Sequence, residues 1–314
     1  MRPLRVARAE PIARDVQLFE FRDPGGGDLP AFTPGAHVTV RAPNGTLRKY
    51  SLCNEASERD RYVIAVKRDA AGHGGSVSLV DGTRAGDTVQ VSEPRNAFEL
   101  AARAPAFIFV AGGIGITPIM SMVRSLVSQG MEKFRLFYLT RSPDMTPFRE
   151  ELAADEFRGK VVIHHDHGDP AKSFDLWPVF EKPTSAHIYC CGPRPMLEAV
   201  RDMTGHWSTA AVHFESFLDA AAQAKPEDKP FTVVLARSGD RIEVAPGASI
   251  LDAMRARGHA APSSCESGTC GTCRTRLVSG EADHRDFVLT QDERAGQVMI
   301  CVSRALTPEI VIDR

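Results

Sequence analysis

The pattern of apolar and polar positions divides the chain into three parts. In residues 1–102, short segments alternate apolar and polar residues, as half-buried strands do, and turns rich in glycine or proline separate them. Clear examples of these alternating segments are residues 38–40, 62–67 and 87–91. Because no helical period extends over three turns here, this part predicts a small antiparallel β-barrel.

Residues 103–222 show a different pattern, in which strands and helices alternate. The run at 106–110 is continuously apolar, which indicates a strand covered on both faces, and apolar residues at helical spacing follow it. Further elements are predicted as strands at 135–141, 161–165, 187–190 and 212–217 and as helices at 147–154 and 195–203. Such alternation is typical of an α/β domain with a parallel sheet.

The last part follows a small, polar, alanine-rich stretch at 218–229, which predicts a linker, with a short helix as the alternative. Beyond it, an α+β domain is predicted, with strands at 231–237 and 241–244, a helix at 249–257 and then a cysteine-rich loop. The expected organisation is therefore multidomain, with domains at residues 1–102, 103–222 and 229–314.

Composition and charge exclude several classes of protein. With 43% hydrophobic and 25% charged residues among 314, the chain is neither disordered nor fibrous. Its 38 basic and 40 acidic residues leave no electrostatic footprint for nucleic acid. The longest apolar run, 104–116, is shorter than the roughly 20 residues of a bilayer span. The charged N-terminus is unlike a signal peptide, so we expect a cytoplasmic protein without a membrane partner.

Four of the seven cysteines fall in the last part of the chain, and their spacing is the strongest chemical signal in the sequence. Cys265, Cys270 and Cys273 form a C-x4-C-x2-C run, and Cys301 follows it. This is the ligand spacing of plant-type [2Fe–2S] centres. The residues between the cysteines are small, and Gly268 and Gly271 allow the loop to wrap tightly. A structural zinc site is the alternative, although zinc prefers paired C-x2–4-C units.

A glycine-rich turn in the second part predicts a nicotinamide dinucleotide site. It follows the apolar strand and opens a helix, where backbone N–H groups and the helix dipole favour a pyrophosphate. The third glycine of the Rossmann fingerprint is replaced by Pro118, so an ordinary tight turn is the alternative. A second motif lies at a strand end, where ligands bind in α/β sheets. The candidate residues of both motifs are Gly112, Gly113, Gly115, Thr117, Cys191, Gly192 and Pro193.

The choice between NADH and NADPH stays open at this point. An acid about 20 residues beyond the glycines favours NADH, whereas an arginine accommodates the 2′-phosphate of NADPH. Here Arg141 and Asp144 both occur in that region. Cys191 likewise has two readings, as a residue that lines the nicotinamide or as a small buried side chain.

Arg48, Tyr50 and Ser51 in the first part offer a cation, an aromatic ring and a hydroxyl for a phosphate and a ring system, with an ordinary strand as the alternative. Taken in order with the glycine-rich turn, the Cys191 motif and the cysteine loop, they resemble the ferredoxin-reductase superfamily, and within it the phthalate dioxygenase reductase family. The resemblance covers essentially the whole chain. It implies an FMN-binding barrel, an NAD-binding domain and a C-terminal plant-type ferredoxin domain with a β-grasp fold.

The resemblance also implies a role for individual residues. Thr117 touches both flavin and nicotinamide, Cys191 lies near the nicotinamide C4, and Glu215 belongs to the segment that approaches the flavin. The positions that it assigns to the flavin site are Arg48, Tyr50, Ser51, Ala65, Val66, Lys67, His73, Gly74, Gly75, Ser76 and Phe217. A terminal phosphate at Gly75 and Ser76 favours FMN over FAD, and the family habit favours NADH.

The function implied is the reductase component of a two-component oxygenase. Electrons pass from NADH through FMN to the [2Fe–2S] cluster and on to a Rieske-type terminal oxygenase that hydroxylates or demethylates an aromatic substrate. Two alternatives stay open: a stand-alone flavin or ferredoxin reductase, including one with structural zinc, and a redox sensor. Glu266 stands where photosynthetic ferredoxins have arginine, and residues 229–314 carry 11 basic and 11 acidic residues, so partner docking differs from that of those carriers.

Overall fold

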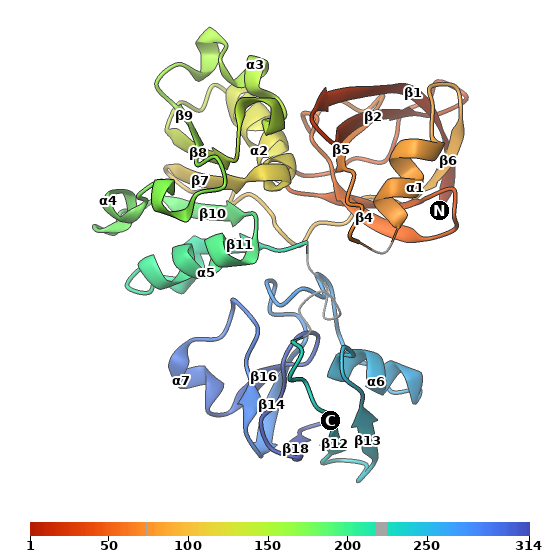
Figure 1. Cartoon of the computed structure of the whole chain (residues 1–314), viewed down its shortest axis with the longest axis vertical. Coiled ribbons are helices and arrows are strands. Elements are labelled where there is room, and N and C mark those ends of the chain that lie inside the picture. Colours follow the sequence, from red (N-terminus) through yellow and green to blue (C-terminus); the bar gives the residue numbers. More distant parts are fainter. Residues whose placement is uncertain (73, 218–224) are drawn as a thin grey trace. The chain divides into compact units, whose positions relative to one another are not determined.

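The computed structural model describes residues 1–72, 74–217 and 225–314, so His73 and residues 218–224 of the predicted linker lie outside it. The described residues form two compact units, Met1–His213 and Phe214–Arg314. The first unit contains two lobes, and the second contains the cysteine-rich loop (Figure 1). No helix in these ranges is long and apolar enough to cross a bilayer.

The first lobe is an antiparallel barrel, as predicted. Its strands are β1 (Arg2–Ala13), β2 (Val16–Arg22), β3 (His37–Arg41), β4 (Leu47–Ser51), β5 (Tyr62–Lys67) and β6 (Thr88–Val91). They pair in the order β4-β3-β6-β1-β2-β5. A bridge between Leu52 and Ile64 joins the two ends of this order, so the sheet closes on itself. The interior is apolar, with Leu4, Phe19 and Val38 among its fully buried side chains.

One helix of this lobe was not predicted. The helix α1 (Gly75–Gly82) has only two buried residues, Gly75 and Leu79, and begins after Gly74 at φ +77°. Eight residues with a glycine at each end carry too little apolar periodicity to stand out from the surrounding strands. The helix packs against β4 and β5, and this contact places its first residues beside the predicted flavin motif.

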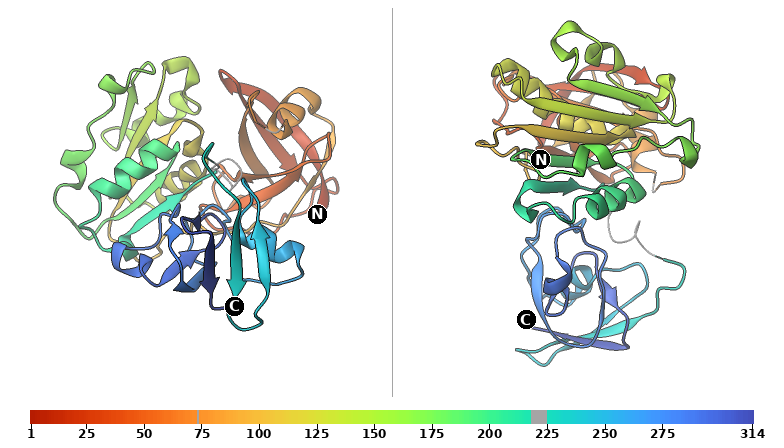
Figure 2. Two further views of the ribbon diagram at one scale, coloured as in Figure 1. Left: turned by 60° about the horizontal axis from the view of Figure 1, so that its bottom comes forward. Right: turned by 90° about the vertical axis from the view of Figure 1, so that its left-hand side faces the viewer.

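The second lobe is a parallel sheet with helices, which confirms the α/β prediction (Figure 2). Its strands are β7 (Phe107–Gly112), β8 (Phe134–Thr140), β9 (Val161–His165), β10 (His187–Cys191) and β11 (Val212–Glu215), in the order β11-β10-β7-β8-β9. The pairs β10–β7, β7–β8 and β8–β9 are parallel. Its helices are α2 (Ile116–Ser128), α3 (Arg149–Leu152), α4 (Trp177–Phe180) and α5 (Arg194–Met203).

Two elements of this lobe are shorter than predicted. The helix expected at 147–154 is reduced to α3, because Phe148 adopts a positive φ of +59° immediately before it. The strand expected at 212–217 ends at Glu215, so Ser216 and Phe217 follow the strand. Neither change alters the order of strands that brings the predicted binding residues to one edge of the sheet.

An apolar cluster joins the two lobes of the first unit. Val16, Leu18 and Cys53 from the barrel belong to the same buried cluster as Phe109 and Ile119 from β7 and α2. A shared core makes relative movement of the lobes costly, because movement would expose this apolar surface to water. The flavin motif and the glycine-rich turn are therefore held in one rigid body.

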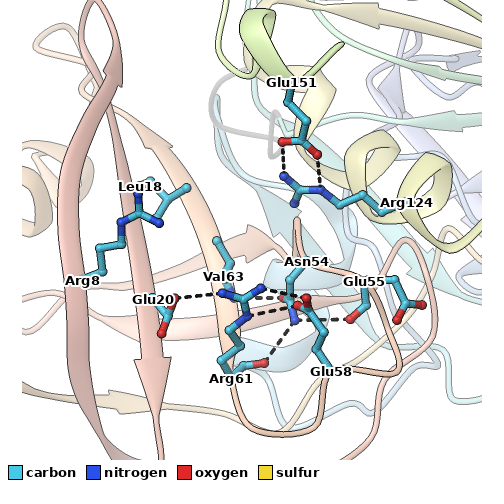
Figure 3. Close-up of a pocket in the computed structure, with 10 residues that line it drawn as sticks. All are labelled: Arg8, Leu18, Glu20, Asn54, Glu55, Glu58, Arg61, Val63, Arg124 and Glu151. Atoms are coloured by element: carbon cyan, nitrogen blue, oxygen red, sulfur yellow. Dashed lines mark hydrogen bonds and ion pairs between the residues drawn. The ribbon is translucent and has the colours of Figure 1, made fainter. Parts of the chain in front are cut away.

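Polar contacts line the same junction around a small cavity of about 280 Å³ (Figure 3). Arg124 of α2 donates to the carboxylate of Glu151 in α3 and also to the backbone carbonyl of Cys53 in the barrel. On the barrel side, Arg61 donates to Glu58 at 2.7 Å and to Glu20 at 3.2 Å. Arg124 thus links both α2 and α3 to the barrel, and Ser121 of α2 adds a hydrogen bond to the Asn54 carbonyl at 2.8 Å.

The second unit contains a mixed sheet and a separate two-stranded antiparallel sheet, which β15 and β17 form. Its strands are β12 (Phe231–Leu235), β13 (Arg241–Val244), β14 (Arg274–Ser279), β15 (Ala282–Asp283), β16 (Gln297–Met299), β17 (Arg304–Ala305) and β18 (Glu309–Ile312). The main sheet has the order β13-β12-β18-β14-β16, in which β12 and β18 are parallel. The helices are α6 (Ile250–Ala256) and α7 (Gln291–Arg294), and α6 packs against β13 as in a β-grasp fold (Figure 1).

The predicted helix at 249–257 is confirmed as α6 within one residue at each end. Ser249 is its N-cap and accepts a hydrogen bond from the backbone N–H of Asp252, and the two form a capping box. The strand predicted at 231–237 ends at Leu235, where a turn leads into β13. The expected α+β domain is therefore present.

We predict that Arg124→Leu lowers the free energy of unfolding of the first unit by about 2 kcal/mol, because the Glu151 carboxylate and the Cys53 carbonyl lose a charged donor. Both tryptophans of the chain, Trp177 and Trp207, lie in this unit, so their fluorescence reports its unfolding in urea. The control is Arg158→Leu, which breaks an exposed pair with Asp155 and costs less than about 0.5 kcal/mol. Equal losses in the two variants would contradict the role given to Arg124.

Candidate cofactor sites

A cavity of about 590 Å³ lies at the carboxyl ends of the parallel strands. Gly112 and Gly113 line it after β7, Arg141 after β8, Asp166 after β9 and Pro193 after β10. This is the edge at which open α/β sheets bind nucleotides. Four of the residues predicted for the dinucleotide therefore meet around one cavity, because parallel strands end at the same edge.

The glycines of the two motifs serve two different purposes. A Cβ atom on Gly115 would lie 2.2 Å from the carbonyl oxygen of Cys191, and one on Gly192 would lie 2.3 Å from Met196. A Cβ on Gly112 would meet Pro193 at 2.6 Å, so these three glycines let the two turns pack on each other. Gly113 differs, because it has φ +52° and nothing lies within 4 Å of its Cβ position. Its backbone is the part of the turn that is open to a ligand.

Thr117 and Cys191 lie beneath the turns, and neither lines this cavity. Thr117 is 2% exposed, and its hydroxyl donates to the backbone carbonyl of Ile114 at 3.0 Å. Cys191, the last residue of β10, is fully buried in the cluster shared with the barrel. Neither side chain is therefore exposed to a ligand in this cavity.

The polar groups near the expected adenosine end are mainly cationic. Asp144 is engaged by its neighbours: Ser142 donates to it at 2.6 Å, and Arg14 forms an ion pair with it. The Ser142 hydroxyl, followed by Arg14, holds the pKa of Asp144 below its usual value. Arg141, by contrast, forms no ion pair among the described residues and lines the cavity, together with Arg14 and Lys67. Lys67 was expected at the flavin and Arg14 was not predicted at all.

The flavin motif lies where β4 meets the N-terminus of α1. A Cβ atom on Gly75 would lie 2.9 Å from the Cγ of Arg48 and 2.9 Å from the hydroxyl of Thr46, so only glycine leaves this space open. Within the described ranges, no carboxylate pairs with Arg48; it donates to the backbone carbonyl of Leu47 at 2.9 Å. Ser76 accepts a hydrogen bond from the N–H of Asp69. A cation beside a helix N-terminus and a glycine fits a phosphate.

Tyr50 provides a second observation that fits a bound group. Its hydroxyl is buried and has no hydrogen-bond partner among the described residues. Burial raises the pKa of this phenol to about 12, so the hydroxyl keeps its proton as a donor. A buried donor without a partner costs free energy unless something binds there. Ser51 is buried at the end of β4. In β5, Ala65 belongs to the apolar cluster shared by the two lobes, whereas Val66 belongs to the barrel interior.

Glu215 and Phe217 are part of the second compact unit, Phe214–Arg314, whereas the flavin motif is part of the first. Glu215 is half-buried at the end of β11, and Phe217 is 48% exposed. His73 lies outside the described residues, whereas Gly74, Gly75 and Ser76 are described and open α1.

In the second unit, the loop with Cys265, Cys270 and Cys273 directs backbone donors at sulfur. The N–H groups of Ser267 and Thr269 lie 3.5 Å and 3.4 Å from the Cys265 sulfur, and that of Cys265 lies 3.5 Å from the Cys270 sulfur. Glu266 takes a positive φ of +60° and Gly268 and Gly271 take +78° and +81°, which produces the tight wrapping. None of the seven cysteines forms a disulfide.

The sulfurs of the four cysteines lie close enough to shift one another's pKa. Hydrogen bonds from Cys270 and Cys301 lower the pKa of Cys265, and their contacts with the Cys265 sulfur raise the pKa of Cys270 and of Cys301. In the described ranges, no three His, Cys, Asp or Glu side chains surround a single ion position. A [2Fe–2S] centre does not require such a group, because each iron takes two protein thiolates and shares the bridging sulfides.

The comparisons with known proteins agree with this arrangement. Three family models match in order: an oxidoreductase FAD-binding domain at 3–100, an oxidoreductase NAD-binding domain at 109–202 and a 2Fe-2S iron-sulfur cluster binding domain at 233–306. These matches and the site geometry define an iron–sulfur flavoprotein oxidoreductase.

Individual relatives narrow the class. The chain is 57% identical to phthalate dioxygenase reductase of Burkholderia cepacia over 99% of this chain and 96% of that protein. It is 37% identical to vanillate O-demethylase oxidoreductase of a Pseudomonas species over 96% of each. A solved phthalate dioxygenase reductase, described as a modular structure for electron transfer from pyridine nucleotides to [2Fe-2S], aligns with a TM-score of 0.73 at 55% identity, covering 100% of this chain and 98% of that one.

The chain therefore belongs to the phthalate dioxygenase reductase family, as its motifs predicted. It is an oxidoreductase whose cofactors are a flavin, a nicotinamide dinucleotide and a [2Fe–2S] cluster, and the expected multidomain fold is confirmed.

We predict that Arg48→Ala weakens flavin retention at least tenfold, because Arg48 is the cation beside the glycine space at Gly75. Flavin content after gel filtration and the dissociation constant for FMN measure this effect. The control is Arg41→Ala on the neighbouring strand β3, an exposed arginine whose atoms are not among the nearest to the Cβ position of Gly75. Unchanged flavin content in Arg48→Ala would show that the phosphate lies elsewhere.

We also predict that Cys270→Ser abolishes assembly of the cluster but leaves flavin reduction by NADH intact, since the two sites lie in separate compact units. Iron and sulfide analysis with stopped-flow flavin absorbance measures both. Cys190→Ala, which changes a fully buried cysteine outside the loop, keeps its iron. Loss of flavin reduction in Cys270→Ser would contradict the independence of the units.

Proposed function

We propose that the protein is the reductase component of a two-component oxygenase and delivers electrons from NADH to a Rieske-type terminal oxygenase with an aromatic substrate. Relatives aligned over almost the whole chain carry the names phthalate dioxygenase reductase, phthalate 4,5-dioxygenase oxygenase reductase subunit and vanillate O-demethylase oxidoreductase. The single observation that carries the proposal is that three cofactor-binding domains, for a flavin, a nicotinamide dinucleotide and a [2Fe–2S] cluster, follow one another in this chain.

Each site has a clear assignment of residues. Arg48, Gly75 and Ser76 hold the phosphate of FMN, and the Tyr50 hydroxyl finds its hydrogen-bond partner there. Gly113 presents its backbone to the dinucleotide pyrophosphate. The four thiolates of Cys265, Cys270, Cys273 and Cys301 bind the cluster. When bound, the dinucleotide supplies a hydride, the flavin accepts two electrons at once and the cluster carries them singly.

The protein's contribution is positioning rather than acid–base chemistry. Thr117 and Cys191 act through the turns in which they are buried: the Thr117 hydroxyl fixes the start of α2, and Cys191 packs against Gly115 at the end of β10. Glu215 stays a proposed member of the site on the resemblance alone. We place the protein in the cytoplasm, where cysteines that form no disulfide stay reduced.

Two other functions are separable by simple measurements. A redox sensor does not turn over, so rapid reduction of cytochrome c by NADH eliminates it. A flavin reductase with structural zinc contains zinc and no iron, so metal analysis eliminates it. A stand-alone reductase reduces cytochrome c but supports no oxygenase. We expect one iron–sulfur cluster and one FMN per chain, and product formation when a Rieske-type aromatic oxygenase is added.

The partner test uses two purified terminal oxygenases, one from a phthalate system and one from a vanillate O-demethylase system, with cytochrome c reduction as the partner-free control. The higher identity to the phthalate reductases predicts faster coupled turnover with the phthalate oxygenase. Normal cytochrome c reduction with neither oxygenase supported would favour a different partner class.

We predict that Arg141→Ala raises the KM for NADPH by at least tenfold more than the KM for NADH. Arg141 lines the dinucleotide cavity at the end of β8, where an arginine contacts a 2′-phosphate and NADH offers none. Steady-state kinetics with both dinucleotides, and with Arg149→Ala as the exposed control, measures the difference. Equal effects on both dinucleotides would place Arg141 at the shared pyrophosphate instead.

A further inference from the structure

Four consecutive residues outside the predicted motifs, Asp283-His284-Arg285-Asp286, contact both the predicted linker, at Asp228, and the cysteine loop, at Gly268. Arg285 donates to Asp228 at 2.9 Å and to Asp283 at 2.8 Å, so it ties the last residues of the predicted linker to the domain. The other two residues of the run, His284 and Asp286, carry buried polar atoms that have no hydrogen-bond partner among the described residues.

Asp286 is a buried carboxylate with incomplete compensation. It is 1% exposed, and its Oδ1 accepts hydrogen bonds from the N–H groups of Val288 at 3.0 Å and Leu289 at 2.7 Å. Its Oδ2 has no hydrogen-bond partner among the described residues, nor does the Nδ1 of His284, which lies 3.7 Å away. Over the same residues, no lysine or arginine forms an ion pair with its carboxylate, although Arg294 donates to the Asp286 backbone carbonyl at 3.4 Å. Native proteins rarely leave such an oxygen unpaired without a function.

The carboxylate keeps its charge in spite of burial. Burial alone raises the pKa of Asp286, but nearby His284, the two backbone N–H donors and the charge of Arg294 outweigh this, so the pKa lies below its usual value. A negative charge is therefore held inside the domain at neutral pH. Loss of the N–H donors of Val288 and Leu289 would destabilise the folded domain, because a buried ionised carboxylate needs hydrogen bonds in place of water.

Asp286 also forms the floor of the cysteine loop. A Cβ atom on Gly268, which lies between Cys265 and Cys270, would sit 3.2 Å from the Cα of Asp286 and 2.7 Å from Val302. The N–H of Phe287 donates to the carbonyl of Gly268 at 2.9 Å. The crest of the loop therefore rests directly on the backbone of residues 286 and 287. The hydrogen bonds to Asp286 Oδ1 set the turn that presents this backbone.

We propose that Asp286 is a positioning residue of the iron–sulfur site, which shapes the floor of the cysteine loop and places a fixed negative charge beneath it that lowers the reduction potential of the cluster. Net charge and hydrogen bonding around the sulfurs are among the features that set such potentials. A buried charge acts strongly because the surroundings screen it poorly. The inference rests on the proposed cluster ligands.

The decisive variant is Asp286→Asn in the full-length protein with its cofactors. Asparagine has the same shape and keeps an acceptor for Val288 and Leu289, but it removes the charge. We expect the cluster to assemble and its midpoint potential, measured by dye-mediated titration with electron paramagnetic resonance, to rise. The expected change is about tenfold in the equilibrium constant for one-electron reduction, which corresponds to ~59 mV.

Asp313→Asn is the control, because it removes a charge of the same domain that is exposed and paired with Arg237. It should leave the potential unchanged. Asp286→Ala removes the acceptor as well as the charge, and we expect its cluster absorbance to decay several-fold faster in the presence of a chelator. If that variant does not fold, Asp286→Asn still decides the question.

An Asp286→Asn potential equal to that of the unaltered protein overturns the inference, as does an equal shift in Asp313→Asn. Failure of the proposed ligand set is distinguishable, because the unaltered protein would then contain no cluster to titrate.

Discussion

Hydride transfer requires a flavin and a nicotinamide at a defined separation, and in this protein the apolar core shared by the barrel and the parallel sheet meets that requirement. Cys53, Leu18 and Val63 of the barrel pack in one cluster with Phe109 and Ile119 of the second lobe. The flavin motif on β4 and α1 and the cavity at the ends of β7 to β10 belong to one compact unit for this reason. The polar bond network around Arg124 orients the lobes, whereas the apolar area supplies most of the free energy.

The glycines of the dinucleotide site show how a familiar motif divides its tasks. From the sequence alone, each glycine of the turn is predicted to let the backbone approach a phosphate. The packing of the turns leaves open space at the Cβ position of Gly113, whereas a Cβ at Gly112, Gly115 or Gly192 would collide with neighbouring protein atoms. Pro118, which breaks the usual fingerprint, lies within the buried first turn of α2 and so does not disturb the open side.

The iron–sulfur domain follows a different logic, in which a loop without regular structure is shaped from both sides. Donors from Ser267 and Thr269 face the Cys265 sulfur, and residues 286 and 287 support the crest of the loop at Gly268. The ligand spacing identifies this site in any sequence, but the support beneath it comes from residues up to 20 positions away. Among these residues, Asp286 is a buried carboxylate whose pKa lies below its usual value, so residues outside the ligand set also contribute to the electrostatic environment of the loop.

The sequence by itself determined the fold class of each part, the family and the cofactors, because these depend on local patterns. Alternation of apolar residues marks strands, glycine turns mark strand-to-helix junctions, and four cysteines at one spacing mark a cluster. The short helix α1 escaped detection, and the helix before Ala154 was overestimated, because positive φ angles at Gly74 and Phe148 end or start elements without an apolar signal. Only the tertiary structure decided that Lys67 and Arg14 face the dinucleotide cavity, that Thr117 and Cys191 are buried beneath it, and that Asp286 supports the cysteine loop. Such relations join residues far apart along the chain, and the packing that brings them together leaves no periodic trace in the sequence.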